Sequence, residues 1–111
     1  MQRDIETVKD MISACTAIQN FVVGISETAF HADEKTQSAV IYQLMIIGEA
    51  AKRLSDEFCW KHAEIPWRDW GAFRNILIHQ YHAVEIEQVW YTVSHEIPEL
   101  KSSLSRIHSG Q

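Results

Sequence analysis

Apolar residues recur at three- and four-residue steps along most of this chain, and this spacing constrains the fold more than any other feature. The first run has seven such positions, namely Ile5, Val8, Ile12, Cys15, Ile18, Val22 and Ile25. A run with this spacing forms one apolar stripe on an α-helix. Alternation with a period of two, which would indicate a half-buried strand, does not persist in any part of the sequence. The pattern therefore predicts an all-α protein.

The second predicted helix has a wider apolar surface than the first and runs from about Asp33 to Phe58. Its main stripe and the apolar residues beside it are Val40, Leu44, Ile47, Ala51 and Leu54, then Tyr42 and Ile46. Packing against a single neighbouring helix would need less apolar surface than this. The pattern therefore fits either a helix at the centre of a bundle or a helix that also faces a second subunit.

The two prolines help to place the remaining helices. Pro66 suits the first turn of a third helix, where its missing N–H group costs no hydrogen bond, and a fourth helix is expected from about Ala83. Pro98 lies inside the apolar pattern of that fourth helix, so we expect a kink or a break there, followed by a short last helix. A chain of 111 residues with these helices predicts a single domain, residues 1–111, folded as an up-and-down bundle of four to five helices.

Composition and charge narrow the classes of function. No apolar run approaches the roughly 20 residues needed to span a bilayer, and the mixed charges of Met1–Glu6 do not resemble a signal peptide. Cys15 and Cys59 are therefore expected to be reduced thiols in a cytoplasmic protein that makes no membrane contact. The net charge of −5 argues against a general nucleic-acid binder. Because residues 50–82 are nearly neutral, a local RNA-processing site and a surface for a basic partner both stay open.

The segment Arg74–Tyr81 concentrates side chains that can carry chemistry. Arg74 supplies a planar cation suited to phosphate, His79 a proton carrier that works near neutral pH, and Tyr81 a hydroxyl that can be modified. RNA cleavage by the neighbouring 2′-hydroxyl needs a base, an acid and cationic donors for the phosphorane oxygens. In such a reaction Arg74 would hold the phosphate, His79 would act as base or acid, and Asn75 would orient the imidazole or the phosphate. This scheme requires neither a metal nor a cofactor.

The spacing of the two candidate catalytic residues raises a geometric problem. On one continuous helix Arg74 and His79 point about 140° apart, because five residues turn the helix by about 500°. They can act together if the helix ends or distorts near Ile78–Gln80, if the long arginine wraps around, or if they meet across a subunit boundary. One imidazole also cannot easily serve both sides of an in-line displacement. A two-fold dimer would bring a second His79 to the same cleft, so the chemistry favours a homodimer.

This segment and its surroundings resemble a known superfamily. Arg-Asn-x3-His-x-Tyr, at residues 74–81, follows Pro66-Trp67 and precedes Val89-Trp90. Together with Ile47–Ala50 and Ile97–Leu100, these elements resemble the HEPN superfamily (higher eukaryotes and prokaryotes nucleotide-binding domain). The closest resemblance is to the HepT-like toxins of type VII toxin–antitoxin pairs.

The resemblance implies a dimeric HEPN helical bundle that cleaves RNA as a metal-independent endoribonuclease. The arginine and histidine of the family motif fall on Arg74 and His79 and would line a cleft between protomers. The tyrosine of the family falls on Tyr81, to which an antitoxin with a minimal nucleotidyltransferase (MNT) fold would transfer AMP. The added group would block the cleft and place negative charge where the RNA phosphate binds. The alternative is a non-catalytic HEPN module that partners a nucleotidyltransferase and binds nucleotide.

Several of these residues also have purely structural interpretations. Arg74 can pair with an acid such as Glu49, which would then have a supporting role in orienting the arginine, and a lone histidine such as His79 is more often structural than catalytic. His79 and His82 have a spacing compatible with a metal pair, but no further ligand has convincing spacing, so no metal site is predicted. Helical spacing favours core packing over base stacking for the three tryptophans Trp67, Trp70 and Trp90.

Overall fold

The computed structural model describes residues 2–110, and every regular element within this range is helical. Met1 and Gln111, the ends of the predicted domain, lie outside the described residues. In chain order the elements are α1 (Gln2–Val22), α2 (Glu27–His31), α3 (Glu34–Arg53), α4 (Asp56–Lys61), α5 (Trp67–His79), the 3₁₀ turn η1 (Tyr81–Ala83), α6 (Ile86–Tyr91), the π-helical segment η2 (Thr92–Glu96) and α7 (Ile97–Ser109). The predicted all-α fold is confirmed.

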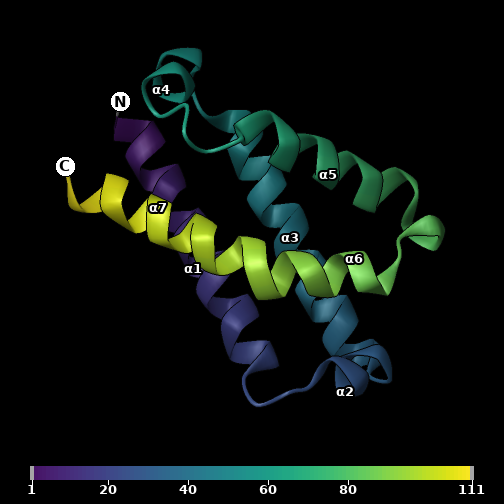
Figure 1. Ribbon diagram of the computed structural model, residues 1–111. Helices are drawn as coiled ribbons and strands as arrows, with labels where there is room; N and C mark the ends of the chain where they lie inside the picture. The colour runs from purple at the N-terminus through teal and green to yellow at the C-terminus, as the bar shows by residue number, and fades with distance from the viewer. Residues whose placement is uncertain (1, 111) are drawn as a thin grey trace.

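Helix α3 occupies the middle of the bundle (Figure 1). It packs against α1 on one side and α5 on the other, and α7 packs against α1. Its buried residues Val40, Leu44 and Ile47 belong to the core of the bundle. The wide apolar surface predicted for this helix is therefore explained largely by its central position, although Tyr42 stays exposed.

The single helix predicted from Asp33 to Phe58 is wrong, because the helix ends at Arg53 and α4 starts at Asp56. Ser55 caps α4 by accepting a hydrogen bond from the Phe58 N–H at 3.1 Å. The Asp4 carboxylate of α1 accepts bonds from the N–H and the hydroxyl of Ser55, at 3.0 and 2.8 Å. Burial alone would raise the pKa of Asp4, but these two bonds, together with nearby positive charge that includes Arg3, lower the pKa overall. A buried carboxylate from another helix thus stabilises the break.

Pro98 does not interrupt the last helical segment, which contradicts the predicted break and short final helix. The chain stays helical from Ile86 to Ser109, and α7 alone has 13 residues. Proline removes one helical hydrogen bond and its ring crowds the carbonyl four residues earlier, which belongs to Ser94. The wider π-helical turn Thr92–Glu96 lies at this place, and we attribute it to the proline. The irregularity expected at Pro98 is therefore a local widening of a continuous helix.

Two sequence-based expectations about compartment and chemistry can be compared with the structure. Within residues 2–110, no helix has the length and apolar character needed to cross a bilayer. Cys15 and Cys59 are both free thiols. Burial raises the pKa of Cys15 to about 12, so this thiol stays protonated and behaves as a small apolar core residue.

Candidate functional site

A close crossing of α3 and α5 positions the first part of the candidate site. At Gly48 an added Cβ would lie 2.7 Å from the Trp70 carbonyl oxygen and would also overlap the Cβ of Arg74. Neither of these atoms belongs to the flexible end of a side chain. Glycine at this position therefore lets the two helix backbones approach and brings Arg74 against α3.

Arg74 forms an ion pair with Glu49 of α3. Its Nη2 lies 2.9 Å from Oε1 of Glu49, and the two side chains are 24% and 47% exposed. This carboxylate oxygen is itself shielded from solvent, and the contact is a close charge pair rather than a well-aligned hydrogen bond. Glu49 thus lies where it can hold the arginine, in the manner considered from the sequence.

Asn75 joins a second cation to this group. Its Oδ1 accepts a hydrogen bond from Nη1 of Arg74 at 3.0 Å and another from Nζ of Lys52 at 3.2 Å. Lys52 was not among the residues singled out in the sequence. The sequence does contain an indication of its position, because Lys52 follows Glu49 by three residues and therefore shares a helix face with Glu49. Asn75 accordingly links Lys52 to the ion pair of Arg74 and Glu49.

His79 and Tyr81 lie at the other end of α5. The helix ends at His79, and the N–H of Gln80 donates to the Ile76 carbonyl at 2.9 Å. The helix therefore ends within Ile78–Gln80, which was one of the three arrangements considered from the sequence. The His79 imidazole is exposed and forms no hydrogen bond or ion pair with any residue in the range 2–110. Tyr81 is 49% exposed in the turn η1, where its ring meets the edge of His82 at a centroid distance of 5.8 Å.

Within one chain the structure brings only part of the predicted site together. Arg74, Asn75 and Glu49 form one connected group with Lys52, whereas His79 and Tyr81 form no hydrogen bond or ion pair with it. Because α5 is helical from Arg74 through His79, the angular separation of about 140° between their directions persists. The helix end therefore frees the imidazole without turning it towards Arg74.

Other interpretations of the candidate residues can also be compared with the structure. Among residues 2–110, no group of three or more His, Cys, Asp or Glu side chains is arranged to hold a metal ion. The tryptophans predicted to pack in the core do so. Trp67 and Trp70 are buried, and Trp90 packs against Phe30 with ring centroids 5.0 Å apart.

An all-α bundle in which Arg-Asn-x3-His-x-Tyr ends a long helix is the arrangement expected of a HEPN-like domain. Comparison with known proteins agrees with this and identifies a more specific family. Residues 11–107 match the sequence model of the family described as "Ribonuclease HepT-like". The chain therefore belongs to the HepT-like ribonuclease family.

Two relatives illustrate this membership. The chain is 40% identical over 100 residues to "Probable ribonuclease HepT" of Thermococcus cleftensis, covering 90% of this chain and 91% of the relative. It is 36% identical over 100 residues to a "Putative RNase" of Caldanaerobacter subterraneus subsp. tengcongensis, covering 90% and 89% of the two chains. No solved structure matches the chain significantly.

Proposed function

We propose that this protein is the toxin component of a toxin–antitoxin pair and cleaves RNA as a metal-independent endoribonuclease. The family membership and the names of the relatives support an RNA substrate. The observation that carries the residue assignment is the exposed, unengaged imidazole of His79 at the end of the helix that carries the positioned Arg74.

The proposed reaction is attack by the 2′-oxygen on the adjacent phosphorus. One imidazole removes the proton from the 2′-hydroxyl, the new O–P bond forms, and the bond from phosphorus to the 5′-oxygen breaks. A second, protonated imidazole gives its proton to the departing 5′-oxygen. In this proposal the two imidazoles are His79 of each protomer in a homodimer, which removes the need for Arg74 and His79 of one chain to share a face.

The cations beside Asn75 suit the phosphate in this reaction. Arg74 donates to the phosphorane oxygens, where negative charge builds up in the transition state. Lys52 contributes a second positive charge to the same area through its contact with Asn75. Glu49 keeps the guanidinium extended from α5 towards α3 while leaving part of it open to a ligand. Glu49 and Asn75 are therefore proposed as positioning residues, and Arg74 as the catalytic phosphate ligand.

The direct test is cleavage of total RNA by the purified chain in the presence of EDTA. We expect wild-type protein to cleave and Arg74→Ala to lose activity by about 10²- to 10³-fold, the usual effect of removing one transition-state donor. Arg68→Ala, which removes an exposed arginine from the start of the same helix, serves as the matched control and should retain activity. Equal loss in both variants, or no cleavage by wild type under any condition, would support the non-catalytic HEPN module instead.

We further propose that a cognate MNT nucleotidyltransferase antitoxin silences this chain by transferring AMP to Tyr81. The phenol is accessible and lies two residues beyond His79, so a bulky anion there would repel the RNA phosphate. The transfer joins the tyrosine oxygen to the α-phosphate of ATP and releases pyrophosphate.

The three tyrosines of the chain provide an internal control for this modification. Tyr42, Tyr81 and Tyr91 are 60%, 49% and 52% exposed, so accessibility alone does not favour Tyr81. Each variant is co-expressed with the nucleotidyltransferase antitoxin, and its intact mass is measured. We expect added AMP in wild type, Tyr42→Phe and Tyr91→Phe, but not in Tyr81→Phe. Modification that persists in Tyr81→Phe would contradict this assignment.

A further inference from the structure

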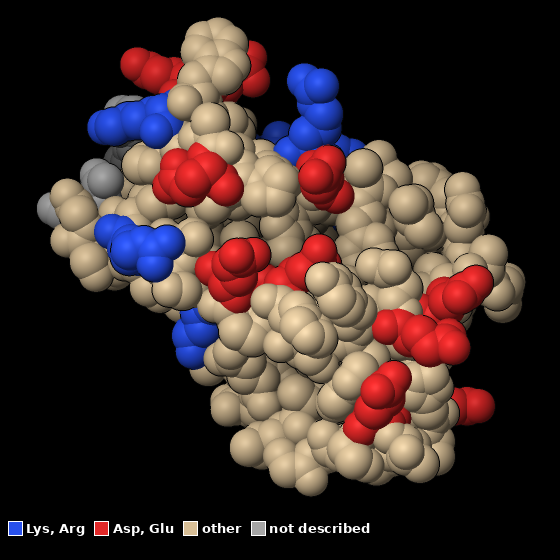
Figure 2. Space-filling model, in the orientation of Figure 1, with Lys and Arg blue, Asp and Glu red and all other residues tan. Residues whose placement is uncertain are grey.

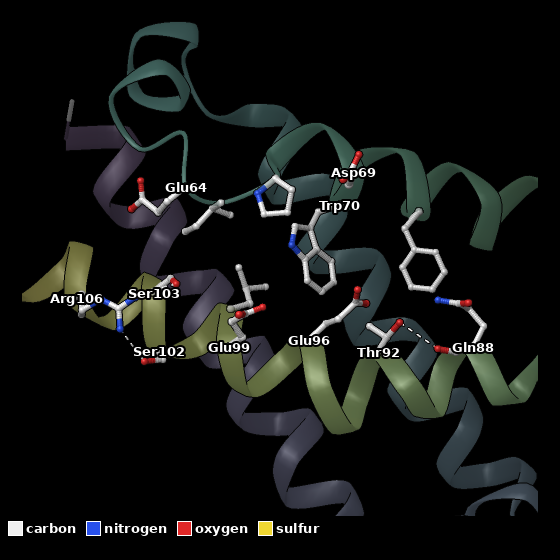
Figure 3. A pocket seen from close by; sticks show the side chains of 14 residues that line it. Glu64, Asp69, Trp70, Gln88, Thr92, Glu96, Glu99, Ser102, Ser103 and Arg106 are labelled. Atoms are coloured by element: carbon white, nitrogen blue, oxygen red, sulfur yellow. Dashed lines mark hydrogen bonds between the residues drawn. The ribbon is translucent and has the colours of Figure 1, made fainter.

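A groove of about 680 Å³ lies between α5 and the continuous segment formed by α6, η2 and α7. Its apolar lining includes Phe73 of α5 and Leu100 of α7. Figure 3 shows Trp70 of α5 in the same lining. Arg74 and His79 are not among the residues that line it. The groove is therefore separate from the proposed ribonuclease site.

Acidic side chains line this groove. Glu64 and Asp69 contribute from the α4–α5 loop and α5, and Glu96 and Glu99 from the opposite wall. Figure 2 shows acidic side chains gathered on the face where these walls meet. Within residues 2–110, none of the four carboxylates forms an ion pair with a lysine, arginine or histidine.

The single cation that lines the groove offsets only part of this charge and pairs with none of the four carboxylates. Arg106 donates to the hydroxyls of Ser102 and Ser103 at 2.9 and 3.1 Å, both on its own helix. Four carboxylates and one guanidinium leave the lining of the groove with an excess of negative charge. A cationic ligand would offset that excess.

A second, independent feature indicates which kind of cation fits. Trp70 is only 7% exposed, and its indole N–H finds no acceptor within residues 2–110. This nitrogen is not sealed in the core, and Figure 3 shows it turned towards the space between α5 and α7. An N–H donor that opens onto a groove is reached by water in the free protein and can donate instead to an acceptor that a ligand brings. A ligand that carries a hydrogen-bond acceptor as well as positive charge therefore fits this groove.

We propose that this groove, defined by Glu64, Asp69, Trp70, Phe73, Glu96 and Glu99, is a docking site for a lysine- or arginine-bearing segment of a second protein. Basic side chains of the segment meet the carboxylates, its backbone carbonyl accepts from Trp70, and its apolar residues cover Phe73. A free polyamine has the charge but no such acceptor. RNA is repelled by the acidic walls, and a second copy of this chain, with a net charge of −5, is a poor electrostatic match.

The test selects ligands from a random dodecapeptide library and measures binding of the best fluorescein-labelled peptide by anisotropy. We expect enrichment of peptides with several Lys or Arg residues and at least one large apolar residue. Glu96→Lys/Glu99→Lys should weaken binding at least about tenfold, and Trp70→Phe about three- to tenfold through the lost N–H donor. Glu34→Lys/Glu57→Lys, which changes the net charge equally at exposed sites outside the groove, should change binding less than about twofold.

Several outcomes would overturn the proposal. These are a library that yields no binders or only non-basic ones, equal weakening in the two charge-reversal variants, and spermine that displaces the peptide and binds Trp70→Phe as well as wild type. Self-association of wild type that Glu96→Lys/Glu99→Lys abolishes would assign the groove to a second copy of the chain. Unfolding midpoints establish that each variant is folded, and Glu96→Gln/Glu99→Gln replaces the lysine pair if that pair unfolds.

Discussion

An equimolar mixture of wild-type and His79→Ala chains, unfolded and refolded together, is expected to retain about a quarter of the ribonuclease activity of the wild-type protein. Random pairing of the two kinds of chain makes only about a quarter of the dimers fully wild type. The proposed cleft needs one imidazole from each protomer, so a dimer with a single His79 lacks either its base or its acid. The pure His79→Ala protein should be slower by about 10²- to 10⁴-fold, the usual contribution of general acid–base catalysis.

The dependence on the mixing ratio distinguishes this arrangement from independent sites. RNA cleavage in EDTA is measured over a series of wild-type fractions at constant total protein. If both imidazoles share one cleft, activity follows the square of the wild-type fraction. A linear decline would mean that each protomer acts alone and would remove the reason for proposing a dimer. His82→Ala, which removes a neighbouring exposed histidine, is the matched control and should leave the rate unchanged.

Gly48→Ala should destabilise the protein by about 1–3 kcal/mol or more, the usual cost of forcing extra volume into a packed contact. On an open helix the same change would be stabilising by up to about 1 kcal/mol, since alanine favours helix more than glycine does. At Gly48 the new methyl group meets the Trp70 carbonyl and the Cβ of Arg74, which move only if α5 moves. The steric effect therefore determines the sign of the change in the free energy of unfolding, which we expect to be destabilising.

Urea unfolding of Gly48→Ala and Gly71→Ala provides the measurement and its control. At Gly71 an added Cβ would lie 3.0 Å from Cγ of Lys52, whose side chain can shift. Gly71→Ala should therefore change the free energy of unfolding by much less than Gly48→Ala. Ribonuclease activity should fall in Gly48→Ala even where the protein is folded, because Arg74 moves with α5. A Gly48→Ala protein as stable as wild type would show that the crossing of α3 and α5 is looser than the structure indicates.

Helical periodicity was sufficient to predict the class of fold and the core packing of Trp67 and Trp70 on α5, because burial of a stripe requires only the residue spacing. It failed at Ser55, where a serine cap is stabilised by Asp4 from a helix 51 residues away in sequence. At Pro98 the local rule for proline predicts a kink or a break followed by a short last helix, whereas the structure widens one turn of a continuous helical segment. At Ser55 a contact from a distant part of the chain therefore outweighed a local preference.

The sequence by itself determined an all-helical domain, its family, and the residues Arg74, His79 and Tyr81 as candidates, because helical period and a short motif are local properties. Only the tertiary structure decided that Glu49 pairs with Arg74, that Lys52 joins them through Asn75, and that four unpaired carboxylates share a groove with Trp70. The first two of these arrangements depend on how closely α3 and α5 cross. That distance is set by Gly48 at one point of the α3–α5 contact, and no spacing along a single helix encodes it.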